Sequence, residues 1–236
     1  MTPMFFLRSF IMNGLAVVLK KRVLVLLSGG IDSAVCATKL CTDGNDVYAL
    51  SIRYPNSANA EEIDNAIFHA KRLHIKHVVV DFNFIEQLTV GVDANMSFNV
   101  GGAINNCISR GKVPMPMSVE LLHVVALMFA RMREIRHIYW SIHKDDIVGD
   151  SEKKIFEYLR ALEGPATLGR YSSCKFELPF IGFSKKEVIE IGESLDVNFD
   201  HTHSCSSSSR VACGVCRQCV LRADAFESLH PKKLAG

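Results

Sequence analysis

The sequence predicts an α/β fold in which helices cover a parallel β-sheet. Three observations lead to this prediction. Apolar runs of strand length alternate with segments of helical periodicity along most of the chain. The first apolar run, Val23 to Leu27, leads directly into a glycine turn and a helix start. Four of the eight cysteines are crowded near the C-terminus, which adds a small metal-binding region to the predicted fold. Alternating strands and helices favour parallel strands joined by right-handed crossovers.

Size and composition place the chain among ordinary globular proteins. It has 236 residues, of which 48% are hydrophobic and 22% charged. The net charge of +2 gives no support for binding nucleic acid or an anionic membrane. The first 19 residues are rather apolar, but they are interrupted by Arg8 and Asn13 and are followed by the basic run Lys20-Lys21-Arg22, unlike a signal peptide. We expect a cytoplasmic protein without a membrane span, in which this segment adds a strand or a docking arm.

The remaining elements continue the alternation. Expected strands cover 47–54, 77–82, 137–142 and 176–180, and expected helices cover about 34–42, 60–73, 118–132, 151–162 and 185–197. Residues 87–112 show little periodicity and predict a loop or short helices near the active site. The helix over 118–132 is apolar nearly all round, so we expect it to be central, with Met117 and Met128 filling the core. Ser184 and Glu187 have the spacing of a capping box.

Three parts are expected along the chain. An N-terminal extension covers residues 1–20, and a nucleotide-binding α/β domain covers 21–175. A C-terminal helical region with a metal site covers 176–236. No internal repeat is evident.

The turn after the first strand has the composition of an anion-binding loop. Its two glycines allow a positive φ and a close approach of the backbone to a ligand. The free N–H groups of the helix start, together with two serine hydroxyls, favour a phosphate or pyrophosphate. No Lys follows the glycines, so this is not a Walker A loop. The plain alternative is a strand, a turn and a helix capped by Ser. The candidate residues are Ser28, Gly29, Gly30, Ile31, Asp32 and Ser33.

The C-terminal cysteines form the second candidate site. Cys205, Cys213, Cys216 and Cys219 have the pattern C-x7-C-x2-C-x2-C. Four thiolates at such spacing can close a tetrahedral shell around Zn²⁺, and a closed shell indicates a structural metal. An iron–sulfur cluster uses the same ligands and is an alternative that the spacing does not exclude. Free or disulfide-bonded cysteines are the second alternative.

The loop sequence SGGxDS resembles the PP-loop of the ATP pyrophosphatases, which have a Rossmann-like parallel sheet of the adenine nucleotide alpha hydrolase type. Together with the cysteine pattern, in this order, it resembles the 7-cyano-7-deazaguanine synthase (QueC) family. The resemblance extends over roughly Arg22 to Leu229. Further matching runs are Ser184-Lys185-Lys186-Glu187, Thr202-His203-Ser204-Cys205 and Cys219-Val220-Leu221-Arg222.

The resemblance implies a ligase of queuosine biosynthesis that forms C–N bonds and cleaves ATP to AMP and pyrophosphate. In that family 7-carboxy-7-deazaguanine is adenylated, ammonia displaces AMP, and a second ATP converts the amide to the nitrile. The cofactors implied are ATP, Mg²⁺ and Zn²⁺, and the family commonly forms homodimers. The residues implied as catalytic are Asp32, which would lie near Mg²⁺, Ser33, Lys185 and Asp146. The residues implied at the substrate are His203 and Arg222, and Arg222 could also bridge the metal site to the active site.

Two segments depart from the family pattern. Met115-Pro116-Met117 replaces the family's Gly-Arg-Asn, and residues 150–154 replace its Tyr-Pro-Asp-Cys-Arg. The first change removes a guanidinium suited to phosphate or carboxylate. Both changes fall at expected substrate-side positions. An alternative function is therefore a divergent QueC-like enzyme from a bacterial antiviral defence cluster. Such an enzyme would join the activated deazaguanine to an amine of a partner protein. A zinc-stabilised nucleotide-binding module without turnover is the non-enzymatic alternative.

Overall fold

The computed structural model of the chain describes residues 9–12, 15–18, 20–54, 59–84, 118–147, 151–163, 173–205 and 211–231. The expectations for residues 87–112, for 115–117, for Met117 and for position 150 lie outside these ranges. None of the helices within them is both long enough and apolar enough to cross a membrane.

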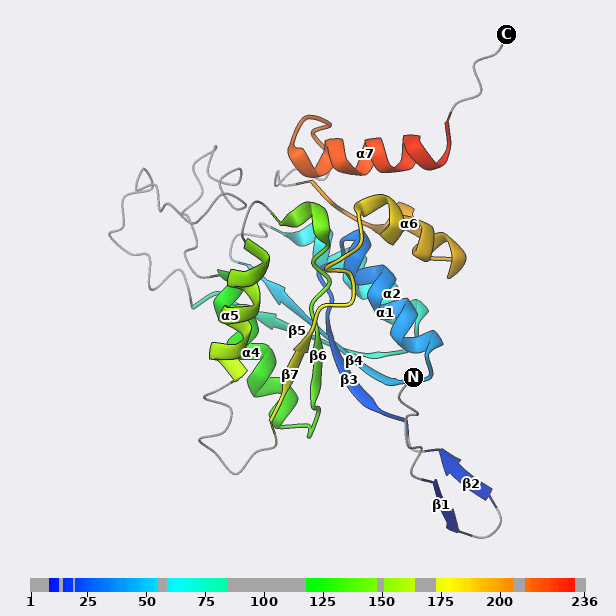
Figure 1. Cartoon of the computed structure of the whole chain (residues 1–236), viewed down its shortest axis with the longest axis vertical. Helices are drawn as coiled ribbons and strands as arrows, with labels where there is room; N and C mark the ends of the chain where they lie inside the picture. The colour runs from blue at the N-terminus through cyan, green and yellow to red at the C-terminus, as the bar shows by residue number, and fades with distance from the viewer. Residues whose placement is uncertain are drawn as a thin grey trace.

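A parallel sheet forms the centre of the molecule, as the alternation of elements predicts. Its strands are β3 (Arg22–Leu26), β4 (Asp46–Arg53), β5 (Lys76–Asp81), β6 (His137–Tyr139) and β7 (Lys175–Glu177). They lie in the order β5-β4-β3-β6-β7, and every neighbouring pair is parallel (Figure 1). The prediction of a parallel α/β sheet is therefore confirmed. Because β7 pairs with β6, the sheet extends into the segment expected to be the C-terminal region.

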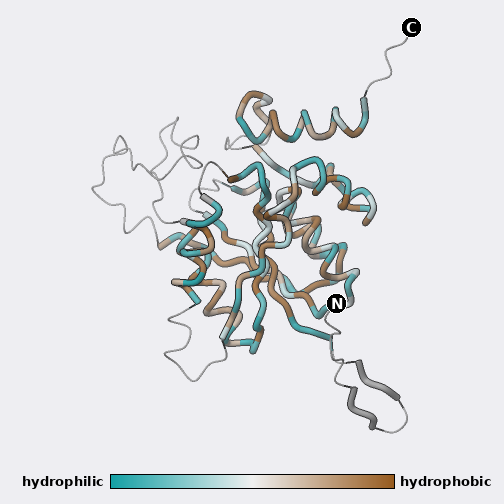
Figure 2. Tube along the Cα trace, in the orientation of Figure 1, coloured by the Kyte–Doolittle hydropathy of each residue, from teal (hydrophilic) through white to brown (hydrophobic). Residues whose placement is uncertain are grey.

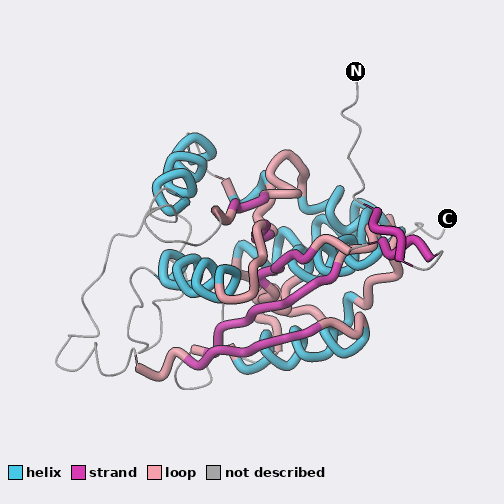
Figure 3. The backbone as a smooth tube through the Cα atoms, turned by 90° about the horizontal axis from the view of Figure 1, so that it is seen from below, coloured by secondary structure: helices cyan, strands magenta, loops and turns pink. Residues whose placement is uncertain are grey.

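Helices cover both faces of the sheet (Figure 3). On one face, α1 (Ile31–Thr42), α2 (Ala60–Arg72) and α6 (Lys185–Ser194) share a core with the side chains of β3 and β4. On the other face, α4 (Ser118–Arg131) and α5 (Ser151–Glu163) pack on the alternate residues of β3 and on β6 and β7. The apolar colour in Figure 2 follows the strands through the centre, which agrees with burial on both faces.

The helix over 118–132 is less central than its composition predicts. Ala126 and Ala130 of α4 are fully buried, but Val124, Met128 and Met132 are 42%, 58% and 75% exposed. The expectation that Met128 fills the core is therefore wrong. A helix that covers a sheet buries only the face toward the sheet, and apolar residues on its other face can stay exposed. An apolar composition therefore does not show that the whole helix is buried.

The strand order creates a switch point between β3 and β6. From β3 the chain proceeds to β4 and β5 on one side, and it then returns to β6 and β7 on the other. In open parallel sheets the ligand crevice lies beyond the carboxyl ends of the strands at such a point. The loop after β3 and the 3-10 turn η2 (Lys144–Asp146) after β6 both lie there.

The C-terminal part places a further helix near this end of the sheet. After α6 the chain passes through the 3-10 turn η4 (Phe199–His201) and then forms α7 (Arg217–Leu229), which lies across α6 in Figure 1. At the other end of the chain, the extension forms an antiparallel pair, β1 (Ser9–Met12) and β2 (Leu15–Val18).

The capping box at the start of α6 is confirmed. The Glu187 N–H donates to Ser184 Oγ at 3.3 Å, and the Ser184 N–H donates to Glu187 Oε2 at 2.7 Å. The box fixes where α6 begins, and Lys185 is the first residue of this helix.

We expect Ser184→Ala to lower the free energy of unfolding by about 1 kcal/mol, because the first turn of α6 loses its side-chain acceptor. Urea denaturation measures the change. Ser194→Ala, at the exposed end of the same helix, is the control and should have a smaller effect. Equal losses in the two variants would contradict the capping role.

Candidate active site and metal centre

The loop after β3 is held by hydrogen bonds among its own residues. Ser33 Oγ accepts from the Ser28 N–H at 3.2 Å and donates to the Gly30 carbonyl at 3.1 Å. Ser28 Oγ accepts from the Gly30 N–H at 3.3 Å. Gly30 is the N-cap residue of α1 and has no side chain that could accept from the first N–H groups of the helix. The helix start therefore keeps backbone N–H groups for a ligand. Ile31 is fully buried and anchors the helix in the core.

Gly29 adopts a conformation that requires glycine. Its φ is +82°, and a Cβ atom there would lie 2.0 Å from the Glu62 carbonyl oxygen of α2. The loop therefore touches the backbone of the neighbouring helix, and only a residue without a side chain fits. This contact brings α2 to the edge of the anion-binding loop.

Asp32 and Lys185 form an ion pair at the switch point. Lys185 Nζ lies 2.9 and 2.7 Å from the two carboxylate oxygens of Asp32, and its side chain is only 5% exposed. The two residues are separated by 153 positions in the sequence but meet because α6 packs against α1. The Asp32 side chain, at 20% exposed, still reaches solvent or a ligand.

His143 lies beside this pair and is 1% exposed. Its Nδ1 accepts from the Asp145 N–H at 3.2 Å, which leaves Nε2 as the ring nitrogen that faces the carboxylates. Nε2 lies 3.7 Å from Asp32 Oδ1 and 3.4 Å from Asp146 Oδ2. One imidazole thus separates the two predicted catalytic carboxylates.

The two acids of η2 have different partners. Asp146 Oδ2 accepts from the His143 N–H at 3.2 Å, and Asp145 Oδ2 accepts from the Lys185 N–H at 2.7 Å. Asp145 therefore ties η2 to the first residue of α6, while Asp146 faces His143. The structure brings Ser28, Asp32, Ser33, Lys185 and Asp146 to one end of the sheet, and their catalytic roles stay predictions.

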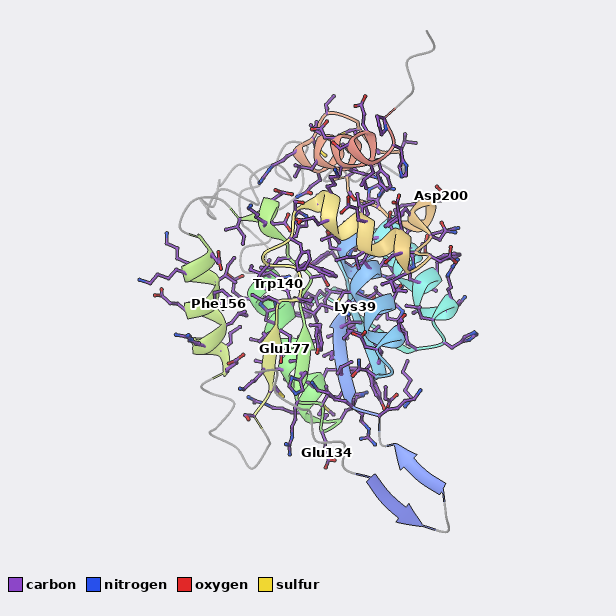
Figure 4. The ribbon with its side chains drawn as sticks, turned by 45° about the vertical axis from the view of Figure 1, so that its right-hand side comes forward. Lys39, Glu134, Trp140, Phe156, Glu177 and Asp200 are labelled. Carbon is purple, nitrogen blue, oxygen red and sulfur yellow. The ribbon has the colours of Figure 1, made fainter. Side chains whose placement is uncertain are left out.

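A cavity of about 260 Å³ opens next to the loop. The residues that line it come from the ends of β3 and β4, from α1, α2 and α4, and from the segment after β6; they include Leu27, Ser51, Glu62, Ile63, Trp140 and Ser141. Trp140, which is half-buried, lies near the middle of the molecule in Figure 4, whereas Glu134 lies at its lower end, away from the loop. The ring centroids of Trp140 and His123 lie 4.4 Å apart. Burial of His123 lowers the pKa of its imidazole to about 4, so the ring is neutral at pH 7.

Glu62 is the lining residue with an altered proton affinity. Its burial raises the pKa of the carboxyl from 4.5 to about 7, and a hydrogen bond with Asn59 partly opposes this effect. The folded state therefore retains the proton between pH 4.5 and 7, where the unfolded chain has already lost it. The stability associated with this group is present at low pH and is lost as the pH rises through 7.

We expect Glu62→Gln to leave the free energy of unfolding unchanged near pH 4 and to raise it at pH 8, by on the order of 2 kcal/mol. Denaturant unfolding at several pH values measures the difference between variant and wild type. Glu61→Gln, the neighbour that does not line the cavity, is the control. A difference that does not change with pH would contradict the raised pKa.

The four C-terminal cysteines form a compact cluster. Their Sγ atoms all lie within 4.8 Å of one another, although the first and last are 14 positions apart in the sequence. A tetrahedral zinc site with Zn–S bonds of about 2.3 Å needs sulfur atoms about 3.8 Å apart, so a small contraction would close the shell. Each of the last three cysteines donates its backbone N–H to the Sγ atom of the cysteine before it in the cluster. The distances are 3.3 Å from Cys213 to Cys205, 3.4 Å from Cys216 to Cys213 and 3.4 Å from Cys219 to Cys216. Such donors stabilise thiolates, and the cluster therefore fits a metal ion.

His203 and Arg222 both lie on the side of the phosphate loop that faces α7. The His203 N–H donates to the Gly29 carbonyl at 3.0 Å, and its side chain is buried. The Arg222 guanidinium donates to Thr202 Oγ1 at 2.7 Å and to the Phe199 carbonyl at 2.9 Å. Arg222 is thus engaged with the segment before the cysteines, and its role toward a substrate stays a prediction.

Three residues at the site were not predicted. His143, Asp145 and Glu62 gain their positions from contacts between elements that are distant in the sequence. A signal existed for the first two, since they follow directly after an expected strand, where polar residues of parallel sheets face the ligand. Glu62 carries no such signal, because an acid in the first turn of a helix is ordinary.

Comparison with known proteins agrees with this geometry. The profile of the family described as queuosine biosynthesis protein QueC matches residues 22–230. A 7-cyano-7-deazaguanine synthase from Methanothermobacter thermautotrophicus is 28% identical over 213 residues, which cover 87% of this chain and 94% of that protein. A synthase of the same name from Methanospirillum hungatei is 29% identical over 213 residues, covering 88% and 96%. Among solved structures, NMN synthetase from Francisella tularensis has the same fold, with a TM-score of 0.51 and 18% identity over 92% of this chain and 79% of that chain.

Proposed function

Because the chain belongs to the QueC family, we propose that it is an ATP-dependent ligase that converts 7-carboxy-7-deazaguanine and ammonia to 7-cyano-7-deazaguanine. The observation that carries the proposal is the meeting of Asp32, Lys185, His143 and the SGGxDS loop at one switch point beside a cavity. The two synthases described above have this activity in their names and match nearly their whole length.

In the proposed reaction, the loop holds the phosphates that leave. The N–H groups at the start of α1 and the Ser28 hydroxyl donate to pyrophosphate oxygens, while Ser33, whose hydroxyl donates to the Gly30 carbonyl, holds the loop in shape. The cavity beside Ile63 and Leu27 takes the apolar face of adenine, which leaves the α-phosphate near Asp32. The Lys185 ammonium, freed from Asp32 as phosphates arrive, stabilises the negative charge that develops during adenylation.

Two metal ions fit the donor sets that are present. Mg²⁺ bound with nucleotide phosphates typically takes one or two carboxylates, and Asp32 and Asp146 are the candidates. The cysteine cluster would hold Zn²⁺ with a closed shell, which leaves no position for substrate and makes the ion structural. Metal analysis of the purified protein tests this assignment and separates zinc from an iron–sulfur cluster.

The reaction is tested by incubating the protein with 7-carboxy-7-deazaguanine, ATP and an ammonium salt. We expect release of pyrophosphate and a product with the mass of the nitrile, preceded by the amide. Omitting ammonia should stop the reaction at the adenylate. No release of pyrophosphate under any of these conditions would refute adenylation, and it would leave the non-catalytic nucleotide-binding module as the better account.

A second acceptor is favoured by the departures at 115–117 and 150–154, where the family has Arg and Cys side chains on the expected substrate side. In this alternative the activated carboxylate passes to an amine of a partner protein. Pyrophosphate release would then occur, but ammonia would give no nitrile. Mass spectrometry of proteins that purify with the chain, searched for the mass of the acyl group, distinguishes this alternative from the synthase reaction.

A further inference from the structure

Residues 199–205, which we call the strap, connect the cysteine cluster to the phosphate loop. The strap ends at Cys205, whose Sγ belongs to the cluster. Two residues earlier, the His203 N–H donates to the Gly29 carbonyl at 3.0 Å. A Cβ atom on Gly30 would lie 3.4 Å from the His203 carbonyl oxygen, so the two backbones are in contact. A movement of Cys205 therefore reaches the loop through a short piece of main chain.

Helix α7 holds the strap at two points. The first is the cluster, because Cys219 lies in α7 and Cys216 caps it. The second is Arg222, one helical turn after Cys219, whose guanidinium donates to Thr202 Oγ1 at 2.7 Å, to the Thr202 carbonyl at 3.3 Å and to the Phe199 carbonyl at 2.9 Å. A metal ion that closes the cluster would fix the N-terminus of α7 and, through Arg222, the middle of the strap.

The bond from His203 determines which way the loop peptide faces. The peptide between Gly29 and Gly30 is planar and trans, so its C=O and N–H point in opposite directions. Holding the Gly29 carbonyl toward His203 turns the Gly30 N–H the other way, toward Ser28 Oγ at 3.3 Å. Gly29 has no Cβ and so has little intrinsic resistance to rotation, which leaves its contacts with the strap and with the Glu62 backbone to set this orientation.

A third contact limits how far the strap can move. His69 Nε2 of α2 lies 2.9 Å from the His201 carbonyl oxygen, and the Phe68 and His201 rings stack at 3.6 Å. These contacts do not involve the cluster and hold the start of the strap whether or not a metal is bound. The segment between His201 and Cys205 is therefore the part that metal binding can order.

We propose that metal binding at the cysteine cluster and nucleotide binding at the phosphate loop are coupled through the strap, and that Arg222 is the positioning residue of this coupling. The inference rests on the proposed function only in taking ATP as the ligand of the loop. It does not depend on which carboxylate is activated or on what accepts it.

Coupling between two binding sites is reciprocal, which gives a test without turnover. The Zn²⁺ affinity is measured by competition with a chromophoric chelator, with and without saturating ATP. In the wild type we expect ATP to tighten Zn²⁺ binding by on the order of 10-fold. In Arg222→Met, which keeps the apolar stem but loses every donor, we expect this ratio to fall close to 1 while one Zn²⁺ still binds.

Two further variants separate coupling from general stability. Thr202→Val keeps the shape of the side chain but removes one acceptor of Arg222 and the hydroxyl's own donation to the Phe199 carbonyl, and it should lower the ratio only partly. Arg133→Met removes a guanidinium that lies 3.8 Å from the Phe129 ring, outside the strap and α7, and should keep the wild-type ratio. If Arg222→Met does not fold, Thr202→Val against Arg133→Met makes the same comparison.

Three outcomes would refute the coupling. If metal-free protein unfolds, ATP raises the apparent Zn²⁺ affinity through folding alone, and the ratio is then at least as large in Arg222→Met as in the wild type. A ratio that is not reduced in Arg222→Met, or a ratio of 1 in the wild type, refutes coupling through the strap and leaves the proposed reaction untouched. An absence of ATP binding to Zn²⁺-loaded wild type refutes the coupling and the proposed function together.

Discussion

Replacement of Asp32 by Asn should lower pyrophosphate release by 100-fold or more, on the order of the loss seen when a preorganised charge is removed from an active site. The substitution keeps the shape of the side chain and removes its charge. An amide binds Mg²⁺ more weakly than a carboxylate does, and it leaves the Lys185 ammonium, only 5% exposed, without a counter-charge. Release of pyrophosphate with 7-carboxy-7-deazaguanine and ATP is the measurement.

The same substitution also affects stability, and a double variant separates the two effects. A buried charge without its partner costs about 3 kcal/mol, so Asp32→Asn should lower the free energy of unfolding by about that amount. Adding Lys185→Met removes the unpaired ammonium and should recover most of the stability. The double variant should nevertheless stay inactive, since both charged groups are gone. A double variant that regained pyrophosphate release would show that the ion pair is only structural.

The local parts of the site could be predicted from the sequence because each one depends on neighbouring residues. The strand, the two glycines and the helix start that follows them are all contained between Val23 and Ser33. The capping box needs only Ser184 and Glu187, and the cysteine cluster needs only the spacing of its four members. The structure places each of these as expected.

The rest of the site depends on the strand order, which the sequence does not specify. His143 lies between Asp32 and Asp146 because β6 lies beside β3 rather than beside β5, and Lys185 meets Asp32 because α6 packs against α1. Composition alone also misplaced Met128, because an apolar side chain can remain exposed on a helix that covers one face of a sheet.

Replacement of Gly29 by Ala should destabilise the fold by more than about 3 kcal/mol and abolish ATP binding. Two costs act together at this position. An L-residue at φ +82° is strained, and the added Cβ would lie 2.0 Å from the Glu62 carbonyl oxygen and 2.8 Å from its carbonyl carbon. Both atoms are backbone within α2, so neither can turn away as a side chain would. Relief requires the loop or the helix to move, and the anion site lies between them.

Gly44 allows the two costs to be separated, because its φ is +81° but nothing lies within 4 Å of an added Cβ. Gly44→Ala should therefore show the conformational cost alone, about 1 kcal/mol, with ATP binding unchanged. Urea unfolding and ATP titration of both variants give the contribution of the contact with α2 by difference. Equal destabilisation of the two variants would mean that α2 yields without cost, and Glu62 would then have to move away from the cavity in Gly29→Ala. A large difference would mean that α2 and the loop form a rigid contact, which is the condition for the loop N–H groups to be preorganised for phosphate.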